Sequence, residues 1–194
     1  MFAIAITLLV LELDVPSGSD LWHELGDQWP SFASYLVSFW VIGIIWVNHH
    51  GVIDHLARAD RPLLFLNLLL LLWVTFLPFP TALMAEHLKS GVSEDVAAAV
   101  YAGAMSLMGL SFGVLWTYIT RHRELLGVEL SDAEIRRRTR AFTIGTPIYL
   151  LSIGAAFISP TAVLVIIALL AVYYALGDRG GGMTSPSRPD ATSE

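Results

Sequence analysis

Six apolar runs recur along the chain, and they constrain its fold more than any other feature. They cover residues 1–13, 32–50, 63–83, 96–120, 141–158 and 161–176. All but the first contain 16 to 25 residues, close to the roughly 20 that a helix needs to cross the hydrocarbon of a bilayer. The runs lack the alternation of a membrane barrel strand. We therefore predict an all-α integral membrane protein with six transmembrane helices.

Composition supports this prediction and excludes several classes of protein. Only 14% of the 194 residues are charged, against about 25% in soluble domains. Cysteine is absent, which excludes a disulfide framework and thiolate chemistry. The net charge of −6 argues against a nucleic-acid partner. The first run lacks the basic start and the cleavage site of a signal peptide.

The basic residues orient the predicted bundle. Ten of the eleven Lys and Arg residues fall on alternate loops or in the C-terminal tail, and Lys89 is the exception. This distribution follows the positive-inside rule for six spans with both termini in the cytoplasm. We expect residues 1–176 to form the transmembrane domain and the Gly/Ser/Pro-rich residues 177–194 to form a disordered cytoplasmic tail.

The loops between the spans carry two further signals. The outer loops are acidic, which indicates either a mild funnel for cations or a simple depletion of basic residues. The Arg-rich loop before residue 141 is predicted to be helical, with Ser131 and Glu134 forming a capping box. The seven outer carboxylates are Asp14, Asp20, Glu24, Asp27, Glu86, Glu94 and Asp95.

The first run places Ile4, Leu8 and Leu11 on one helix face, with Thr7 at its edge. Most such stripes in membrane helices face lipid or the rest of the bundle. Around the axis of an oligomer, however, rings of these side chains would form an apolar constriction that gates by dewetting. A ring of Thr hydroxyls would partly replace the hydration shell of an ion.

Polar side chains gather in the second and third runs, where Trp46, His49, His50 and Asn67 lie. Three interpretations are open. His50 and Asp54 share a helix face and could bind a metal, the imidazoles could cap the last carbonyls of the helix, or the four residues could form an interhelical polar cluster. We predict that the chain binds neither a metal ion nor a cofactor. No carboxylate lies in the middle of a span and no nucleophile motif is present, so we predict no enzyme activity.

Two further motifs predict local geometry. Pro78 and Pro80 should kink the third run near its outer end. The small residues Gly109 and Gly113, like Ala99 and Gly103, are spaced for close helix packing.

Three stretches together resemble the bacterial branch of the endolysosomal potassium channel family. They are FAIAITLLVLEL in the first run, WVNHH in the second and LLFLNLLLLLWVTFLPFPT in the third. That family has six helices per unit and no TVGYG filter, and this sequence has no TVGYG either. The motifs cover residues 1–85, and the resemblance rests on topology beyond them.

The resemblance implies a role for each candidate residue. The first helices would line the pore of a homotetramer in the bacterial plasma membrane, with Ile4 as the main constriction and Leu8 and Leu11 as further layers. Thr7 would correspond to the threonine linked to potassium preference. A polar cluster would contain Trp46, His50 and Asn67, with His49 beside it.

In the family, that cluster packs against an N-terminal R-x-x-x-F-S-D segment, which this sequence lacks. We expect the first helix to be longer than the 13-residue run 1–13 and translation to begin upstream of Met1.

The resulting prediction is a potassium-permeable channel in contact with lipid, copies of itself and monovalent cations. One alternative is a proton or nonselective cation leak. An alternative of another class is a membrane scaffold without ion flux, with the Arg-rich loop as its binding surface.

Overall fold

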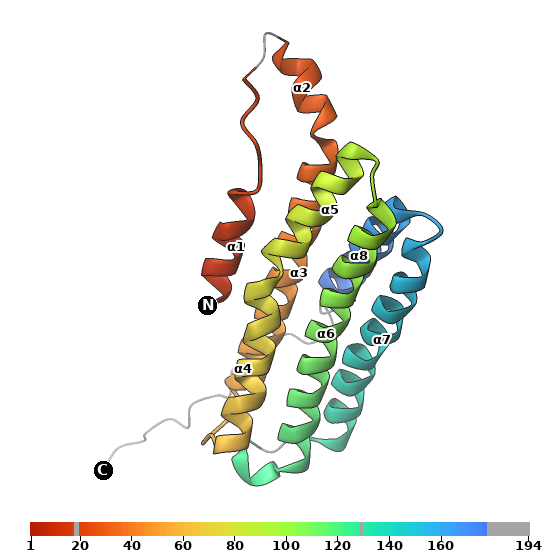
Figure 1. Ribbon diagram of the computed structural model, residues 1–194. Coiled ribbons are helices and arrows are strands. Elements are labelled where there is room, and N and C mark those ends of the chain that lie inside the picture. Colours follow the sequence, from red (N-terminus) through yellow and green to blue (C-terminus); the bar gives the residue numbers. More distant parts are fainter. Residues whose placement is uncertain (18–19, 129, 178–194) are drawn as a thin grey trace, which may run out of the picture.

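The computed structural model describes residues 1–17, 20–128 and 130–177, and these form a bundle of helices (Figure 1). Apart from the two helices that meet at residue 77, successive long helices run in opposite directions along the bundle (Figure 1). The helices are α1 (Phe2–Val10), α2 (Leu21–Asp27), α3 (Trp29–Ile53), α4 (Arg61–Phe76), α5 (Pro78–Ser90), α6 (Glu94–Arg121), the short 3-10 helix η1 (Arg123–Leu125), α7 (Asp132–Ala156) and α8 (Pro160–Gly177).

Three helical stretches in the described residues are long and apolar enough to cross a membrane. They are Trp29–Ile53, Arg61–Ser90 (α4 and α5 taken together) and Glu94–Arg121, and Pro160–Leu176 is a shorter apolar helix. The helical architecture predicted from the apolar runs is confirmed. The predicted tail lies outside the described residues, apart from Gly177, which ends α8.

The third apolar run is interrupted where its prolines predict. α4 ends at Phe76 and α5 begins at Pro78, with Leu77 between them in a helical conformation. Pro78 and Pro80 have no N–H to donate, so the backbone hydrogen-bond ladder cannot continue through them. The prolines therefore coincide with a one-residue interruption between two helices that follow the same course (Figure 1), and the predicted kink stays a prediction.

The core of the bundle is centred on α6, which packs against α4, α5, α7 and α8. Tyr101 is fully buried on this helix. Its hydroxyl lies 2.8 Å from the Ser38 hydroxyl of α3, which lies 2.8 Å from the Thr81 hydroxyl of α5. Thr81 also donates to the Leu77 carbonyl at 2.8 Å. This buried network satisfies three hydroxyls and joins three helices.

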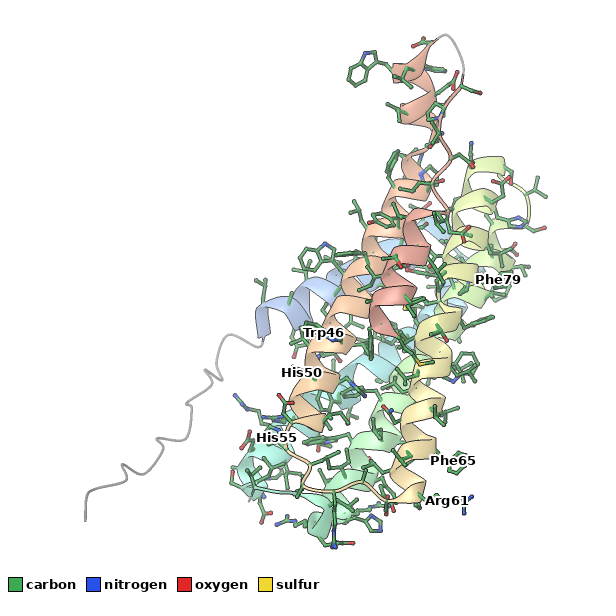
Figure 2. The ribbon with its side chains drawn as sticks, turned by 90° about the vertical axis from the view of Figure 1, so that its left-hand side faces the viewer. Trp46, His50, His55, Arg61, Phe65 and Phe79 are labelled. Carbon is green, nitrogen blue, oxygen red and sulfur yellow. The ribbon has the colours of Figure 1, made fainter. Side chains whose placement is uncertain are left out.

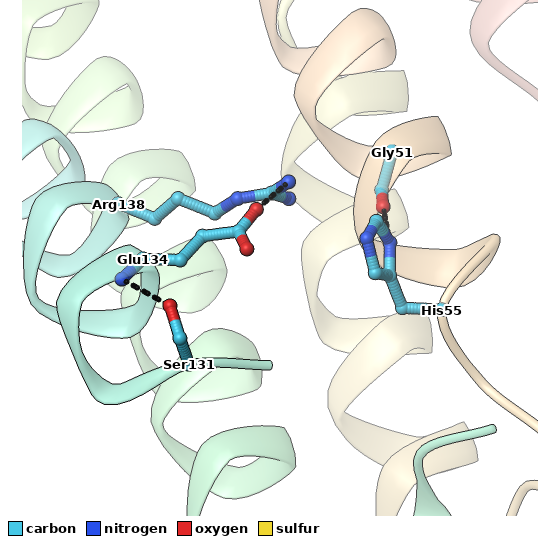
Figure 3. A network of polar contacts seen from close by, with 5 residues as sticks. All are labelled: Gly51, His55, Ser131, Glu134 and Arg138. Carbon is cyan, nitrogen blue, oxygen red and sulfur yellow. Dashed lines mark hydrogen bonds and ion pairs between the residues drawn. The ribbon is translucent and has the colours of Figure 1, made fainter. Parts of the chain in front are cut away.

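The Arg-rich loop is helical, as predicted, and it continues into the fifth apolar run as the single helix α7. The Ser131 hydroxyl accepts a hydrogen bond from the Glu134 N–H at 3.2 Å (Figure 3). The Glu134 carboxylate does not complete the capping box but accepts from Arg138 at 2.8 Å. An arginine one turn further along the helix is a stronger partner for a carboxylate than a backbone N–H.

The basic loops meet at one end of the bundle. The Ala57 N–H donates to the Leu125 carbonyl at 2.9 Å, and the Gly127 N–H donates to the His55 carbonyl at 2.8 Å. The His55 ring itself bonds the Gly51 carbonyl (Figure 3). These contacts bring the Arg-containing loops after α3 and α6 together, while the acidic loops before α2 and α6 lie at the opposite end (Figure 1).

One helix was not predicted from the sequence. α2 occupies part of the first outer loop, and the Asp20 carboxylate caps it by accepting from the His23 N–H at 3.3 Å. The segment is short and polar, so the search for apolar runs passed over it.

Candidate ion pathway

α1 lies on the outside of the bundle, against α3, α4 and α5 and beside the upper half of their length (Figure 1). Phe2, Ala5 and Leu9 are its buried residues. They recur at intervals of three and four residues, so they form one helix face. The opposite face of α1 is not buried by any other part of the described chain.

The four predicted pore residues lie on that uncovered side. The exposed fractions are 59% for Ile4, 41% for Leu8 and 74% for Leu11, and Thr7 is exposed as well. Leu11 follows the last residue of α1 but keeps a helical conformation, with φ of −72°. The sequence spacing therefore places all four side chains on one surface of the subunit.

The Thr7 hydroxyl has a defined orientation. It donates to the Ile4 carbonyl of the preceding turn at 2.9 Å. Its only proton is thereby engaged, and its oxygen lone pairs remain available to a cation. An exposed oxygen of this kind next to apolar side chains can replace part of an ion's hydration shell.

The predicted polar cluster is divided into two pairs. In the first, the His49 Nε2 lies 2.7 Å from the Asn67 Oδ1, which joins α3 to α4. Phe2 of α1 contacts the same imidazole, with ring centroids 5.3 Å apart. The side chains of His49 and Asn67 are both partly buried. Phe2 brings α1 into contact with the His49 ring of this pair.

The second pair lies on the exposed side of α3 (Figure 2). The His50 ring stacks on Trp46 with centroids 5.8 Å apart and an interplanar angle of 4°. Its Nε2 lies 3.5 Å from an oxygen of Asp54. Adjacent residues differ by about 100° in direction around a helix, so His49 and His50 cannot both reach Asn67.

The described residues contain no group of three His, Cys, Asp or Glu side chains arranged to hold a metal. His50 and Asp54 alone provide two ligands on one exposed helix face. The His49–Asn67 pair thus joins two packed helices. The uncovered face of α1 is an apolar surface that carries the hydroxyl group of Thr7.

Comparisons with known proteins identify the family of this chain. The family described as "Endosomal/lysosomal potassium channel TMEM175" matches residues 1–78. A potassium channel of Streptomyces collinus is 49% identical over 178 residues, which are 90% of this chain and 86% of that protein. A potassium channel of Chamaesiphon minutus is 39% identical and covers 91% of this chain and 89% of its own length.

A solved structure agrees with the sequence relationship. The crystal structure of a lysosomal potassium-selective channel TMEM175 homolog from Chamaesiphon minutus superposes with a TM-score of 0.80, at 39% identity and over 91% of both chains. These relatives are named as ion channels and not as enzymes, in agreement with the prediction of no enzyme activity. The resemblance inferred from three short motifs is confirmed over nine-tenths of the sequence, and the chain belongs to the TMEM175 potassium channel family.

Proposed function

We propose that this chain is one subunit of a homotetrameric, potassium-permeable channel of the bacterial plasma membrane. The subunit spans the membrane six times with both termini in the cytoplasm. The α1 helices of the subunits surround the ion path. The observation that carries this proposal is the uncovered face of α1, in a chain whose relatives are named potassium channels.

The position of α1 supports this arrangement. One helix cannot enclose a pore, so several copies must meet around an axis, and closed symmetric assemblies are the usual solution. In such an assembly the uncovered side of α1 faces the axis while Phe2, Ala5 and Leu9 remain packed on their own subunit. The apolar side chains on the uncovered side then become mutual neighbours.

Within the pore, Ile4 forms the main constriction, and Leu8 and Leu11 form further apolar layers nearer the outer end. Such a neck blocks ions when it is dry and conducts when it is wetted. The Thr7 oxygens lie between the layers and compensate partly for lost hydration. Because direct coordination is sparse, we expect potassium selectivity to be modest.

The orientation follows from charge. The arginine-rich loops lie at one end of the bundle and mark the cytoplasmic side, where basic residues accumulate. The acidic loops at the other end face outward and raise the local concentration of cations. The pore therefore opens outward near the end of α1 that leads into the acidic loop.

The test is a measurement of reversal potentials in planar bilayers under separate K⁺, Na⁺ and H⁺ gradients. We expect potassium-selective current from the natural chain. Ile4→Asn should raise conductance severalfold and reduce the preference for K⁺, because an amide keeps the neck wet. Leu169→Asn is the matched control, since Leu169 is 64% exposed on α8, away from α1.

Unchanged permeation in Ile4→Asn would remove Ile4 from the constriction. A reversal potential that follows the H⁺ gradient, or that is equal for K⁺ and Na⁺, would replace this proposal with a proton or nonselective cation leak. Absence of any flux would favour a scaffold.

A further inference from the structure

A groove of about 610 Å³ opens along α6, between α4 and α7. Leu66 of α4 lines one side, and Phe142 and Leu150 of α7 line the other. Gly113 lies in the floor, and a Cβ at this position would meet no atom within 4 Å. The small residues Gly109 and Gly113 were both predicted to pack closely against another helix. A Cβ at Gly109 would contact Tyr149 and Thr146 of α7 at 3.5 and 3.6 Å, which confirms the prediction there. The space beside Gly113 is open, so the prediction is wrong at that position.

The groove changes character along its length. Leu110 and Leu150 lie at its upper part, and Arg121 and His122 lie at its lower end, beside the arginine-rich loops. His122 is held in place by stacking on Tyr118, with ring centroids 4.1 Å apart. An apolar channel thus ends in two groups that can carry positive charge.

The acidic groups of the subunit offset only part of the positive charge at the lower end, where the Asp60 carboxylate lies within electrostatic reach of His122. Arg123 is paired with Asp132 at 2.6 Å and Arg138 with Glu134 at 2.8 Å. The Arg121 guanidinium, in contrast, is exposed and has no ion-pair partner among the residues that the structure describes. Its position at the mouth of an apolar groove leaves it available to an anion that also carries a hydrocarbon chain.

The length of the groove matches one leaflet of a bilayer. Leu110 precedes Arg121 by eleven residues, which corresponds to roughly 17 Å along an α-helix. Half of the hydrocarbon thickness is about 15 Å. The apolar part therefore extends from the headgroup level to near the bilayer midplane.

We propose that this groove binds one anionic phospholipid of the cytoplasmic leaflet. One acyl chain lies over Gly113 between α6 and α7, and the phosphate is bound by Arg121 and His122. Basic pockets between membrane helices on the cytoplasmic side suit anionic headgroups. The site rests on the proposed function only for its orientation, because α1 packs on α3, α4 and α5, whereas the groove is lined mainly by α6 and α7.

The test is the affinity of the purified full-length chain for phosphatidylglycerol and phosphatidylcholine, measured by native mass spectrometry. Arg121→Gln should weaken phosphatidylglycerol binding about fivefold, the effect of one basic residue near an anionic surface, with little change for phosphatidylcholine. Gly113→Leu fills the floor and should weaken both lipids. Gly103→Leu is the matched control, because Gly103 lies on the same helix with equally open space at its Cβ.

Inorganic phosphate at millimolar concentration should not displace the lipid, since the acyl chain contributes to binding. Displacement by phosphate would show a headgroup site alone and overturn the proposal. An unchanged lipid preference in Arg121→Gln, or equal effects of Gly113→Leu and Gly103→Leu, would overturn it as well. A change in oligomeric mass in Gly113→Leu without loss of lipid would show that a protein surface covers the groove. All of these readouts are independent of ion flux, so they separate this proposal from that of the pore.

Discussion

α1 and α6 are both apolar helices, but they have opposite relationships to the bundle. α6 packs against four other helices and contributes Tyr101, Met105 and Met108, which are at most 1% exposed. α1 packs on the outside, and Ile4, on its free side, is 59% exposed. α1 is the more apolar of the two helices but the less buried, so hydropathy alone does not reveal which helix forms the core. The difference indicates that α6 holds the subunit together, whereas the free side of α1 contributes little to packing within it.

The comparison is tested most strongly by removing side chains from each helix. Met105→Ala leaves a cavity in a fully buried site and should destabilise the subunit by about 2–5 kcal/mol. Leu8→Ala, at a position 41% exposed, should cost less than about 1 kcal/mol, because little packing within the subunit is lost. Chemical unfolding of both variants in detergent measures these values. A cost for Leu8→Ala equal to that for Met105→Ala would contradict the peripheral position of α1.

The buried hydroxyl network sharpens the account of α6. Ser38→Ala removes the central group and leaves the hydroxyls of Tyr101 and Thr81 with one partner fewer, which should cost about 1–3 kcal/mol. Tyr101→Phe removes an outer group, and Ser38 keeps its contact with Thr81. We therefore expect the smaller effect from Tyr101→Phe, and the same unfolding measurement would refute the network if the order were reversed.

The smallest effect is expected at the lower end of α6. The Tyr118 hydroxyl donates to the Asp60 Oδ2 at 2.6 Å and holds the pKa of that carboxyl below its ordinary value of 3.8. The stabilisation is present above that value and is lost as the pH falls through the lowered pKa. Melting temperatures between pH 6 and pH 3 should therefore fall more steeply for the natural chain than for Asp60→Asn. Parallel curves would show that this contact contributes nothing to stability.

Much of the fold could be predicted because a membrane-spanning helix requires a long run of apolar residues, and the charges of the loops on either side indicate its direction. The break at Pro78 and the Ser131 cap were likewise predictable from single residues. α2 was not, because a short polar helix in a loop has no apolar run. The continuity of α7 across its arginines was not predicted either, since those residues lie in the helix but outside the apolar run.

The site was predictable where one helix determines it and not where two helices meet. Ile4, Thr7, Leu8 and Leu11 share a face by spacing alone, and the structure places them together on the exposed side. The pairing of Asn67 with His49 rather than with His50 depends on the rotation of α3 about its axis. That rotation is set by packing against α5, α8 and α1, which the sequence pattern does not reveal.

Gly109 and Gly113 make the same point. They occupy one spacing motif, yet only Gly109 meets α7 closely. α6 and α7 stay in contact below that point, through Trp116 and Thr139 at 2.9 Å, so the open space beside Gly113 is local, and the spacing motif does not predict it.

The central claim is that the uncovered face of α1 lines the ion path. Because the natural chain contains no cysteine, a single Cys substitution introduces the only thiol. Potassium flux from liposomes is measured before and after addition of Cd²⁺ for Ile4→Cys and for Ala5→Cys, whose position is fully buried against the subunit. The account predicts that Cd²⁺ blocks flux through Ile4→Cys and leaves Ala5→Cys unchanged. Continued flux through Ile4→Cys in saturating Cd²⁺, or equal block of both variants, would contradict it.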